Sequence, residues 1–353
     1  MNYKETLFFI AKCLTITLDD INRKAIEKQL KSKSIDWGLV VKISTTHYVF
    51  SALYCNFKRN KFLKYLPKNL VEYMKYITNL NRDRNKKIIR QAKALNSLLL
   101  DNEVKPIFLK GTGNLLEGLY EDIGERIVTD IDFLCSEKDF LMAIDILKDD
   151  NYLIPKKSVD FFPGYRHYPS LVKKKNIAAV EIHKEVIIEK YRAEFNYKII
   201  SENTQMINDY CVLSFEDQLS LSIITSQIND YGWELENFSL RNAYDVFLLS
   251  KKVDTKKAFS RFNRLKNPLI CFLANCNLVF GNIDTLGYTK TKESESYSLA
   301  FNNSFKKRKS NSKKNFKILK VNFERRFNIL CKSIFNMKNR KWLLNRIKRR
   351  IKI

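Results

Sequence analysis

The sequence predicts an α+β fold, in which a small α/β core lies between two helical regions. Three observations lead to this prediction. Residues 1–100 have helical periodicity, strand-like and helical segments alternate between residues 101 and 195, and helical periodicity returns between residues 196 and 280. Residues 281–353 follow as a linker and a basic tail. We therefore expect four regions with these boundaries.

The composition agrees with a folded, mainly helical chain. The 353 residues are 45% hydrophobic, which is enough for a sizeable core and excludes a disordered chain. Nine glycines and six prolines are few, and this scarcity favours helices over long flexible linkers.

The N-terminal region ends in the clearest helical pattern. Ile88, Ala92, Leu95 and Leu99 recur at i, i+4, i+7 and i+11. This spacing places one apolar stripe toward a core.

The expected core contains three strands and two helices. The strands are residues 104–109, 127–135 and 178–186, and the helices are residues 113–120 and 137–150. Residues 151–165 have loop and turn signals.

The C-terminal half is expected to be helical. Helices are predicted at residues 215–228, 240–253 and 257–280, with a linker from residue 281 to residue 315. The remaining segment predicts an amphipathic basic helix, because Phe323, Phe327, Leu330 and Ile334 share one face.

The positive charge is concentrated at the C-terminal end. The net charge is +26, and residues 301–353 carry nineteen Lys and Arg against Glu324 alone, which gives +18 and leaves +8 for the rest. Such a tail suits RNA, an anionic membrane surface or acidic partners, although a solvated run of charges is the commoner explanation.

The seven cysteines are odd in number and scattered, without CxxC pairs or zinc-type spacing. They indicate reduced thiols.

Lys12 interrupts the apolar start of the chain, and no apolar run reaches the length of about 18 residues that a spanning helix needs. The expected location is cytoplasmic.

Acidic residues on two predicted strands carry the strongest chemical signal. Because side chains alternate along a strand, Asp130 and Asp132 project from one face, and Glu181 and His183 likewise share a face. Three carboxylates on neighbouring strands repel one another unless a cation lies among them. Carboxylate oxygens are ligands for Mg²⁺, which borrows further oxygens from substrate phosphates.

Two nearby features fit a phosphate-binding role. Lys110 and Gly111 end a predicted strand and open a helix, where backbone N–H groups and the ammonium can hold phosphate oxygens. Arg126, four residues before Asp130, adds a fixed cation. Each also fits a surface charge or an ordinary turn, and a D-x-D pair on a strand is frequent by chance.

Several motifs together resemble a known family. LKG at residues 109–111, LY at 119–120, R-x-x-x-D-I-D-F-L from Arg126 and V-E-I-H at 180–183 are similar to the bacterial uncharacterised nucleotidyltransferases, which belong to the polymerase-β-like nucleotidyltransferase superfamily. The resemblance runs from about Trp37 to Lys251 and includes HYVFSALY, R-H-Y-P and L-R-N-A-Y-D-V. It implies a polymerase-β-like core with a small mixed sheet.

The resemblance also implies an activity. Asp130 and Asp132 would bind two Mg²⁺ ions, or Mn²⁺, with Glu181 as the third carboxylate and general base. Lys110 and Gly111 stand where the superfamily usually has a Gly-Ser pair that grips the triphosphate. The reaction would move a nucleoside monophosphate from an NTP such as ATP to an unidentified acceptor: a small molecule, a glycan-linked metabolite, a protein or RNA.

Five further residues are candidates for substrate contact. His167 and its neighbour Arg166 match the R-H-Y-P segment, and His183 matches the family's V-E-I-H, although a core hydrogen bond is an equal interpretation for His183. Arg241 and Asp245 match L-R-x-x-x-D, with an ion pair within one helix as the simpler interpretation. The family often has a histidine in the preceding helix, where this chain has T-S-Q at residues 225–227.

A second class of function remains open. The same fold could bind a nucleotide without catalysis and use the basic tail of residues 301–353 to hold RNA or an anionic membrane. The carboxylates argue against this alternative, because acids facing phosphates are costly without a metal.

Overall fold

The computed structural model describes residues 1–32, 34–155, 165–305 and 311–351, with the side chains of 311–314, 325 and 349–351 not described. The loop expected at residues 151–165 and the basic tail therefore lie partly outside the described residues.

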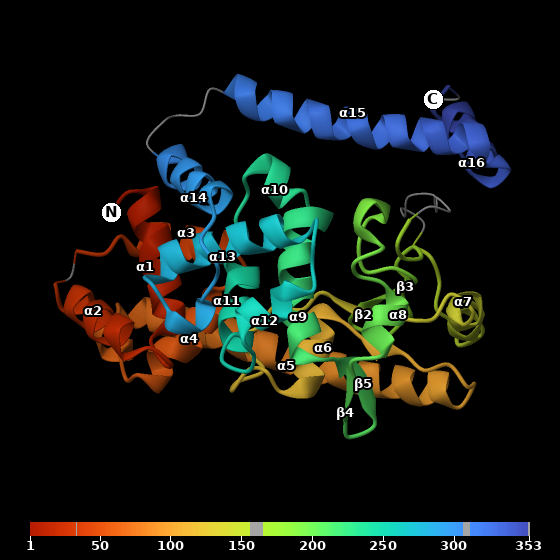
Figure 1. Cartoon of the computed structure of the whole chain (residues 1–353). Coiled ribbons are helices and arrows are strands. Elements are labelled where there is room, and N and C mark those ends of the chain that lie inside the picture. Colours follow the sequence, from red (N-terminus) through yellow and green to blue (C-terminus); the bar gives the residue numbers. More distant parts are fainter. Residues whose placement is uncertain (33, 156–164, 306–310, 352–353) are drawn as a thin grey trace.

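The N-terminal region is helical, as predicted. It contains α1 (Tyr3–Thr15), α2 (Asp20–Lys31), α3 (Trp37–Thr46), α4 (Phe50–Arg59), a 3-10 turn (Leu63–Tyr65) and the long α5 (Lys68–Leu100). The predicted stripe of α5 is buried, since Ile88, Ala92, Leu95 and Leu99 are at most 2% exposed. Helix α5 runs along the lower part of the molecule (Figure 1).

The sheet is small and mixed, which confirms the predicted fold class. Its five strands are β1 (Ile107–Phe108), β2 (Asp130–Leu134), β3 (Ala179–His183), β4 (Thr204–Ile207) and β5 (Tyr210–Leu213), in the order β3-β2-β1-β5-β4. The pairs β2/β3 and β1/β5 are parallel, and β1/β2 and β4/β5 are antiparallel.

Two of these strands lie in a region that we expected to be helical. The hairpin of β4 and β5 turns at Asn208, which has a left-handed φ of 52°. Strand β5 lies beside β1 near the centre of the sheet, so the sheet continues beyond residue 195.

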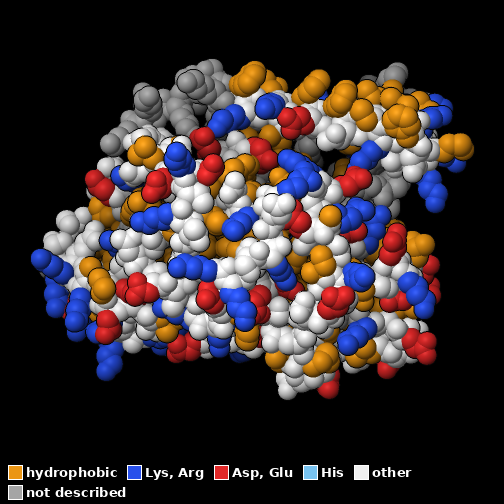
Figure 2. Space-filling view, viewed as in Figure 1, with side chains coloured by type: hydrophobic (Ala, Val, Ile, Leu, Met, Phe, Trp, Pro, Cys, Tyr) orange, Lys and Arg blue, Asp and Glu red, His pale blue; other side chains and the backbone are white. Residues whose placement is uncertain are grey.

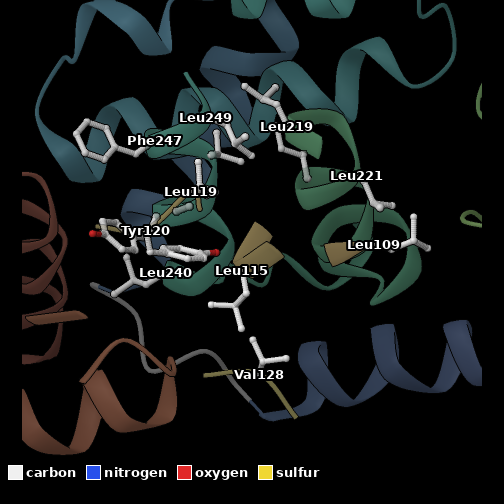
Figure 3. Close-up of a cluster of buried hydrophobic side chains, with 14 of the residues drawn as sticks. Leu109, Leu115, Leu119, Tyr120, Val128, Leu219, Leu221, Leu240, Phe247 and Leu249 are labelled. Carbon is white, nitrogen blue, oxygen red and sulfur yellow. The ribbon is translucent and has the colours of Figure 1, made fainter. Parts of the chain in front are cut away.

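The other helices of the core flank the sheet. They are α6 (Lys110–Glu117), α7 (Phe140–Asp149), a 3-10 turn (Glu189–Tyr191) and α8 (Tyr197–Ser201). Leu109 and Leu115 from the start and middle of α6 pack in a buried apolar cluster with Leu221 of α9 and Leu240 of α11 (Figure 3).

The C-terminal helices are more broken than predicted. They are α9 (Phe215–Ile224), a π-helical turn (Thr225–Asn229), α10 (Gly232–Leu235), α11 (Leu240–Leu249), α12 (Thr255–Ser260), α13 (Lys266–Phe280) and a 3-10 turn (Asp284–Leu286). The helix expected at residues 257–280 is therefore two helices.

The segment expected as a linker contains a helix, α14 (Lys292–Ser304). A capping box of Thr291 and Ser294 starts it, and Phe301 is buried near Phe238, with ring centroids 5.4 Å apart. The tail forms α15 (Asn311–Phe335) and α16 (Met337–Ile351). Within the described residues, no helix is long and apolar enough to cross a bilayer.

Polar side chains of α5 position the strands that carry the acidic residues. Asn81 donates to the carbonyl of Arg126 (3.0 Å), and Asn85 donates to the same carbonyl (2.7 Å), just before β2. Gln91 exchanges two hydrogen bonds with the backbone of Ala178, just before β3. Because both strand starts are tied to one helix, α5 fixes where β2 and β3 begin relative to each other.

Candidate active site

The acidic residues of β2 and β3 lie side by side. The parallel register pairs Asp132 with Glu181 and Leu134 with His183. His183 is 1% exposed, and its Nε2 donates to Oδ1 of Asp132 at 2.8 Å and lies 3.7 Å from Oε2 of Glu181. A ligand atom from each of the three residues falls within 4.8 Å of the others.

Lys110 reaches the same cluster from the start of α6. Its Nζ lies 2.6 Å from Oδ1 of Asp132. Its backbone has a left-handed φ of 51°, which is uncommon for a residue with a side chain and concentrates at functional sites. The chain turns tightly here, since a Cβ on Gly113 would lie 2.8 Å from the carbonyl oxygen of Phe108.

Asp132 is held as a carboxylate. Burial raises its pKa, but the charge of Lys110 and the hydrogen bond from His183 outweigh burial, so its pKa lies well below the ordinary value. Both contacts fall on Oδ1, and Oδ2 has no hydrogen-bond partner among the residues that the structure describes.

Asp130 lies at the start of β2 and is partly buried. Its Oδ1 accepts a hydrogen bond from Thr129 (3.0 Å). Burial raises the pKa of Asp130, and the negative charges of Asp132 and Glu181 raise it further. The three acids therefore act on one another electrostatically.

Glu181 is held by a serine that the sequence did not single out. Ser170 donates to Oε1 of Glu181 at 2.8 Å. Burial acts to raise the pKa of Glu181, but the contact with His183 and the charges of His167 and Lys110 outweigh burial, and the net pKa lies below its ordinary value.

The segment after residue 164 runs along β3 and brings two predicted contacts to the cluster. The backbone of His167 forms an isolated antiparallel β-bridge with His183, and their ring centroids lie 5.0 Å apart. Nδ1 of His167 lies 3.9 Å from Oε2 of Glu181. Arg166 donates to the carbonyl of Val186 (3.3 Å). Burial lowers the pKa of Arg166, and the negative charges of Asp230 and Glu181, which act to raise this pKa, only partly offset burial.

The donor set fits a hard divalent cation. Two of the three clustered ligand groups are carboxylates, and a third carboxylate, Asp130, has its pKa raised by their charge. A divalent ion would offset this repulsion, and oxygen donors of this kind are those that Mg²⁺ and Mn²⁺ take. His183 Nε2 carries the proton that it donates to Asp132, so His183 orients that carboxylate in this arrangement.

Arg126 and Asp245 contact each other. The guanidinium donates through Nε to both oxygens of Asp245 (3.1 Å each) and through Nη1 to the carbonyl of Ile127 (2.7 Å). Tyr120 donates to the same carboxylate at 2.7 Å. This buried clamp joins the segment before β2 to α11, and Asp245 pairs with Arg126 instead of with Arg241 on its own helix.

The adjacent residues form a second clamp between the same segments. Tyr244 donates to Glu125 at 2.5 Å, and Arg59 of α4 also contacts Glu125. Glu125 is 2% exposed. Together the two clamps tie the loop before Asp130 to two helices.

Arg241 faces the cluster from α11. It lies over the ring of Tyr48 at 5.1 Å, and its buried Nε has no hydrogen-bond partner among the described residues. Burial lowers the pKa of Arg241, while the charges of Asp130 and Asp230 act in the opposite direction. A guanidinium whose buried Nε has no hydrogen-bond partner among the described residues is suited to an anionic oxygen.

Asp230 is a fourth carboxylate near the cluster that sequence reasoning missed. Burial raises its pKa, while the charges of Lys110, Arg166 and Arg241 lower it. Asp230 follows the π-helical turn. The chain passes so close to that turn at Gly232 that a side chain there would meet the backbone of Ser226. The tetrapeptide N-D-Y-G at residues 229–232 is a turn signal, and it was the available indication that the helix ends at an acidic residue.

The T-S-Q segment, where the family often has a histidine, forms the start of that π turn. Gln227 is 1% exposed and accepts a hydrogen bond from Tyr297 of α14 at 3.2 Å. It therefore supports the packing of α14 against the core.

Comparison with protein-family models gives a match that spans this region of the chain. The model of the uncharacterised nucleotidyltransferases matches residues 33–281, more than half of the chain, and this range contains every residue described above as part of the acidic cluster. No curated protein and no solved structure matches the chain. With the mixed sheet and the acids gathered on β2 and β3, the family match shows that this chain belongs to the uncharacterised nucleotidyltransferase family.

Proposed function

We propose that this protein transfers a nucleoside monophosphate from an NTP, such as ATP, to the hydroxyl group of an acceptor, with Mg²⁺ or Mn²⁺ as cofactor. The acceptor is a small molecule, a glycan-linked metabolite, a protein or RNA. The observation that carries the proposal is the pairing of Asp132 with Glu181 on adjacent strands beside Lys110, with Asp130 two residues before Asp132 on the same strand. Family membership supports a nucleotidyl-transfer role in general.

The three carboxylates would hold the metal ions. Bound there, the ions would neutralise charge on the phosphates and lower the pKa of the acceptor hydroxyl. Oδ2 of Asp132 is the oxygen best available for this purpose, because Lys110 and His183 both contact Oδ1.

In the proposed reaction the acceptor oxygen bonds to the α-phosphorus, the bond to the bridging oxygen breaks, and pyrophosphate leaves. Glu181 is the proposed base that takes the hydroxyl proton, since its lowered pKa keeps it ionised at neutral pH. Ser170 and His183 fix its position. Most of the catalytic effect would come from positioning and charge neutralisation.

The cations around the cluster would bind the triphosphate and the acceptor. We assign the triphosphate to Lys110 and the backbone at Gly111, and further substrate contact to Arg166, His167 and Arg241. Arg126 and Asp245, which we predicted as nucleotide and substrate contacts, contact each other. In our proposal they position the loop that leads to Asp130.

Partners and location follow from the same reasoning. We propose that the tail of residues 301–353 contacts a polyanionic partner, either RNA or an anionic membrane. The seven cysteines are free thiols, which supports the proposed cytoplasmic location.

Thermal unfolding with each of the four NTPs, in Mg²⁺ and in excess chelator, tests this function. We expect Mg²⁺-dependent stabilisation by at least one nucleotide, lost in Asp130→Asn and Asp132→Asn, because each change removes a proposed ligand. Asp145→Asn removes an exposed acid of α7 and should behave as the parent.

Incubation with α-labelled NTPs and a cell lysate would then identify the acceptor, by showing whether label enters RNA, protein or a small metabolite. Equal nucleotide binding by the parent and both aspartate variants, with no incorporation of label, would favour the alternative function as a binding protein without catalysis.

A further inference from the structure

Helix α15 presents its apolar side chains to solvent. Six of them recur at helical spacing and are 51–69% exposed: Phe316, Leu319, Phe323, Phe327, Leu330 and Ile334. We call these six residues the apolar stripe. Figure 2 shows hydrophobic side chains gathered along the upper edge of the molecule, over α15.

The opposite face of α15 meets the rest of the protein through polar contacts. Lys317 pairs with Glu236 beside α10 (2.7 Å), and Lys332 pairs with Glu189 after β3. Among the described side chains of α15, the buried ones are Val321 and Ser333. This is the reverse of an ordinary surface helix, which buries its apolar face against the core.

An exposed apolar stripe of this length indicates that another surface binds to it. Isolated exposed apolar residues are normal, but a contiguous patch marks a site of interaction. Two more exposed apolar residues lie where α15 ends and α16 begins, since Phe335 is 89% and Met337 is 79% exposed.

The charge of the two tail helices identifies the chemistry of the partner. Residues 311–351 contain fourteen Lys and Arg against Glu324 alone. Lys320 and Arg326 border the stripe on its two sides at helical spacing. Cations that flank an apolar face are typical of helices that lie in the surface of an anionic bilayer.

Two other occupants fit less well. A second copy of α15 would bring the same excess of positive charge against the first, and like charges repel. RNA would neutralise the cations but leave the aliphatic members of the stripe, Leu319, Leu330 and Ile334, in water.

We propose that α15 and α16 bind the surface of an anionic phospholipid bilayer, with the apolar stripe inserted at the boundary between headgroups and acyl chains. Lys and Arg on both helices contact the lipid phosphates. This attachment is peripheral, and it holds the acidic cluster of β2 and β3 close to the membrane surface. It does not depend on the proposed transferase activity.

Co-sedimentation of the full chain with vesicles tests the proposal. Vesicles of phosphatidylcholine alone are compared with vesicles that also contain phosphatidylglycerol. We expect binding to the anionic vesicles, weakened by salt. The double variant Phe323→Ser/Phe327→Ser should lower the partition coefficient on the order of tenfold to a hundredfold, because two large apolar side chains no longer insert.

Matched variants distinguish the loss of membrane insertion from the effect of changing any exposed aromatic or basic side chain. Tyr73→Ser/Tyr76→Ser removes two exposed aromatic residues of α5 and should bind as the parent does. Lys341→Glu/Lys348→Glu on α16 should weaken binding, whereas Lys75→Glu/Lys87→Glu on α5, the same change of charge, should weaken it much less. Thermal unfolding of each variant checks that the fold is retained.

Three results would overturn the proposal. The parent could remain in the supernatant with anionic vesicles, or the Phe323/Phe327 variant could bind them as strongly as the parent. Alternatively, the stripe could prove necessary for binding to single-stranded RNA or for a dimer in sedimentation velocity, with vesicles not bound, which would assign the surface to RNA or to a second copy.

Discussion

Asp230 lies in the combined field of three cations, Lys110, Arg166 and Arg241. In the proposed reaction these same cations bind the triphosphate, so Asp230 competes with the substrate for them. Asp230→Asn should therefore tighten ATP binding several-fold, up to about tenfold, since it removes one unit of negative charge from beside these cations. Titration calorimetry with Mg²⁺ and ATP measures this change.

Asp145→Asn, an exposed change of the same kind, is the control and should leave the dissociation constant unaltered. Weaker binding by Asp230→Asn would mean that Asp230 contacts a metal ion or the nucleotide directly. That outcome would still leave the acids of β2 and β3 as the proposed centre.

For single residues, the sequence was informative where the local geometry of one strand determines which way a side chain projects. Two-residue alternation was enough to predict that Glu181 and His183 share a face, and the parallel register of the two strands then places both residues near Asp132. The pairing of Arg126 with Asp245 was not predictable, because the two residues are 119 positions apart and only the packing of α11 brings them together. Whether each of these residues has its predicted role in catalysis stays a prediction.

The π-helical turn after α9 is an element that a single glycine permits. A Cβ on Gly232 would lie 2.4 Å from the carbonyl oxygen of Ser226, which is backbone and cannot rotate away. Gly232→Ala should lower the free energy of unfolding by about 1–3 kcal/mol, because the turn must open to admit the methyl group. Urea unfolding measures this loss.

Gly38→Ala is the matched substitution. Its Cβ would meet Asp36 at 3.4 Å, an ordinary contact, and Gly38 lies in α3, where alanine is the better helix former. We expect Gly38→Ala to leave stability unchanged or slightly raised. Equal stability of the two variants would show that the turn at Gly232 yields easily.

The hairpin of β4 and β5 shows what sequence patterns miss at the scale of elements. All four residues of β5 are buried, so the strand lacks the alternation of a half-exposed strand, and four residues are too few to set a period. By contrast, the apolar face of α15 has a long, regular pattern, and an amphipathic helix was predicted there from the sequence, although its exposure was not. The length of the element and a one-sided apolar pattern in its sequence decided which elements were predictable.

Across the whole molecule, the parts that surround the site come from distant segments. Helix α5 sets the starts of β2 and β3, α11 holds the loop before Asp130, and α14 supports the π turn through Tyr297. The family match covers α5 and α11 and ends at residue 281, before α14. The tail helices therefore lie beyond the part of the chain that defines the family.

This division predicts different results for two truncations of the tail. Phe301 is buried against Phe238, and the partly buried Phe305 packs against Phe8, with ring centroids 6.4 Å apart, so both rings contribute to the core packing. A chain that ends at Phe305 should keep its thermal stability and its nucleotide binding but lose binding to anionic vesicles. A chain that ends at Ala300 lacks both rings and should be less stable by about 3 kcal/mol or more.

Thermal unfolding, titration with nucleotide and vesicle co-sedimentation on the two truncated chains measure these effects. Loss of nucleotide binding in the chain that ends at Phe305 would contradict the separation of the tail helices from the nucleotide-binding region. It would instead assign the tail to the site, through the cavity of about 490 Å³ that Tyr165, next to Arg166, lines together with residues such as Arg326 and Trp342. Retained nucleotide binding with lost vesicle binding would mean that the tail serves attachment and the family region serves the nucleotide.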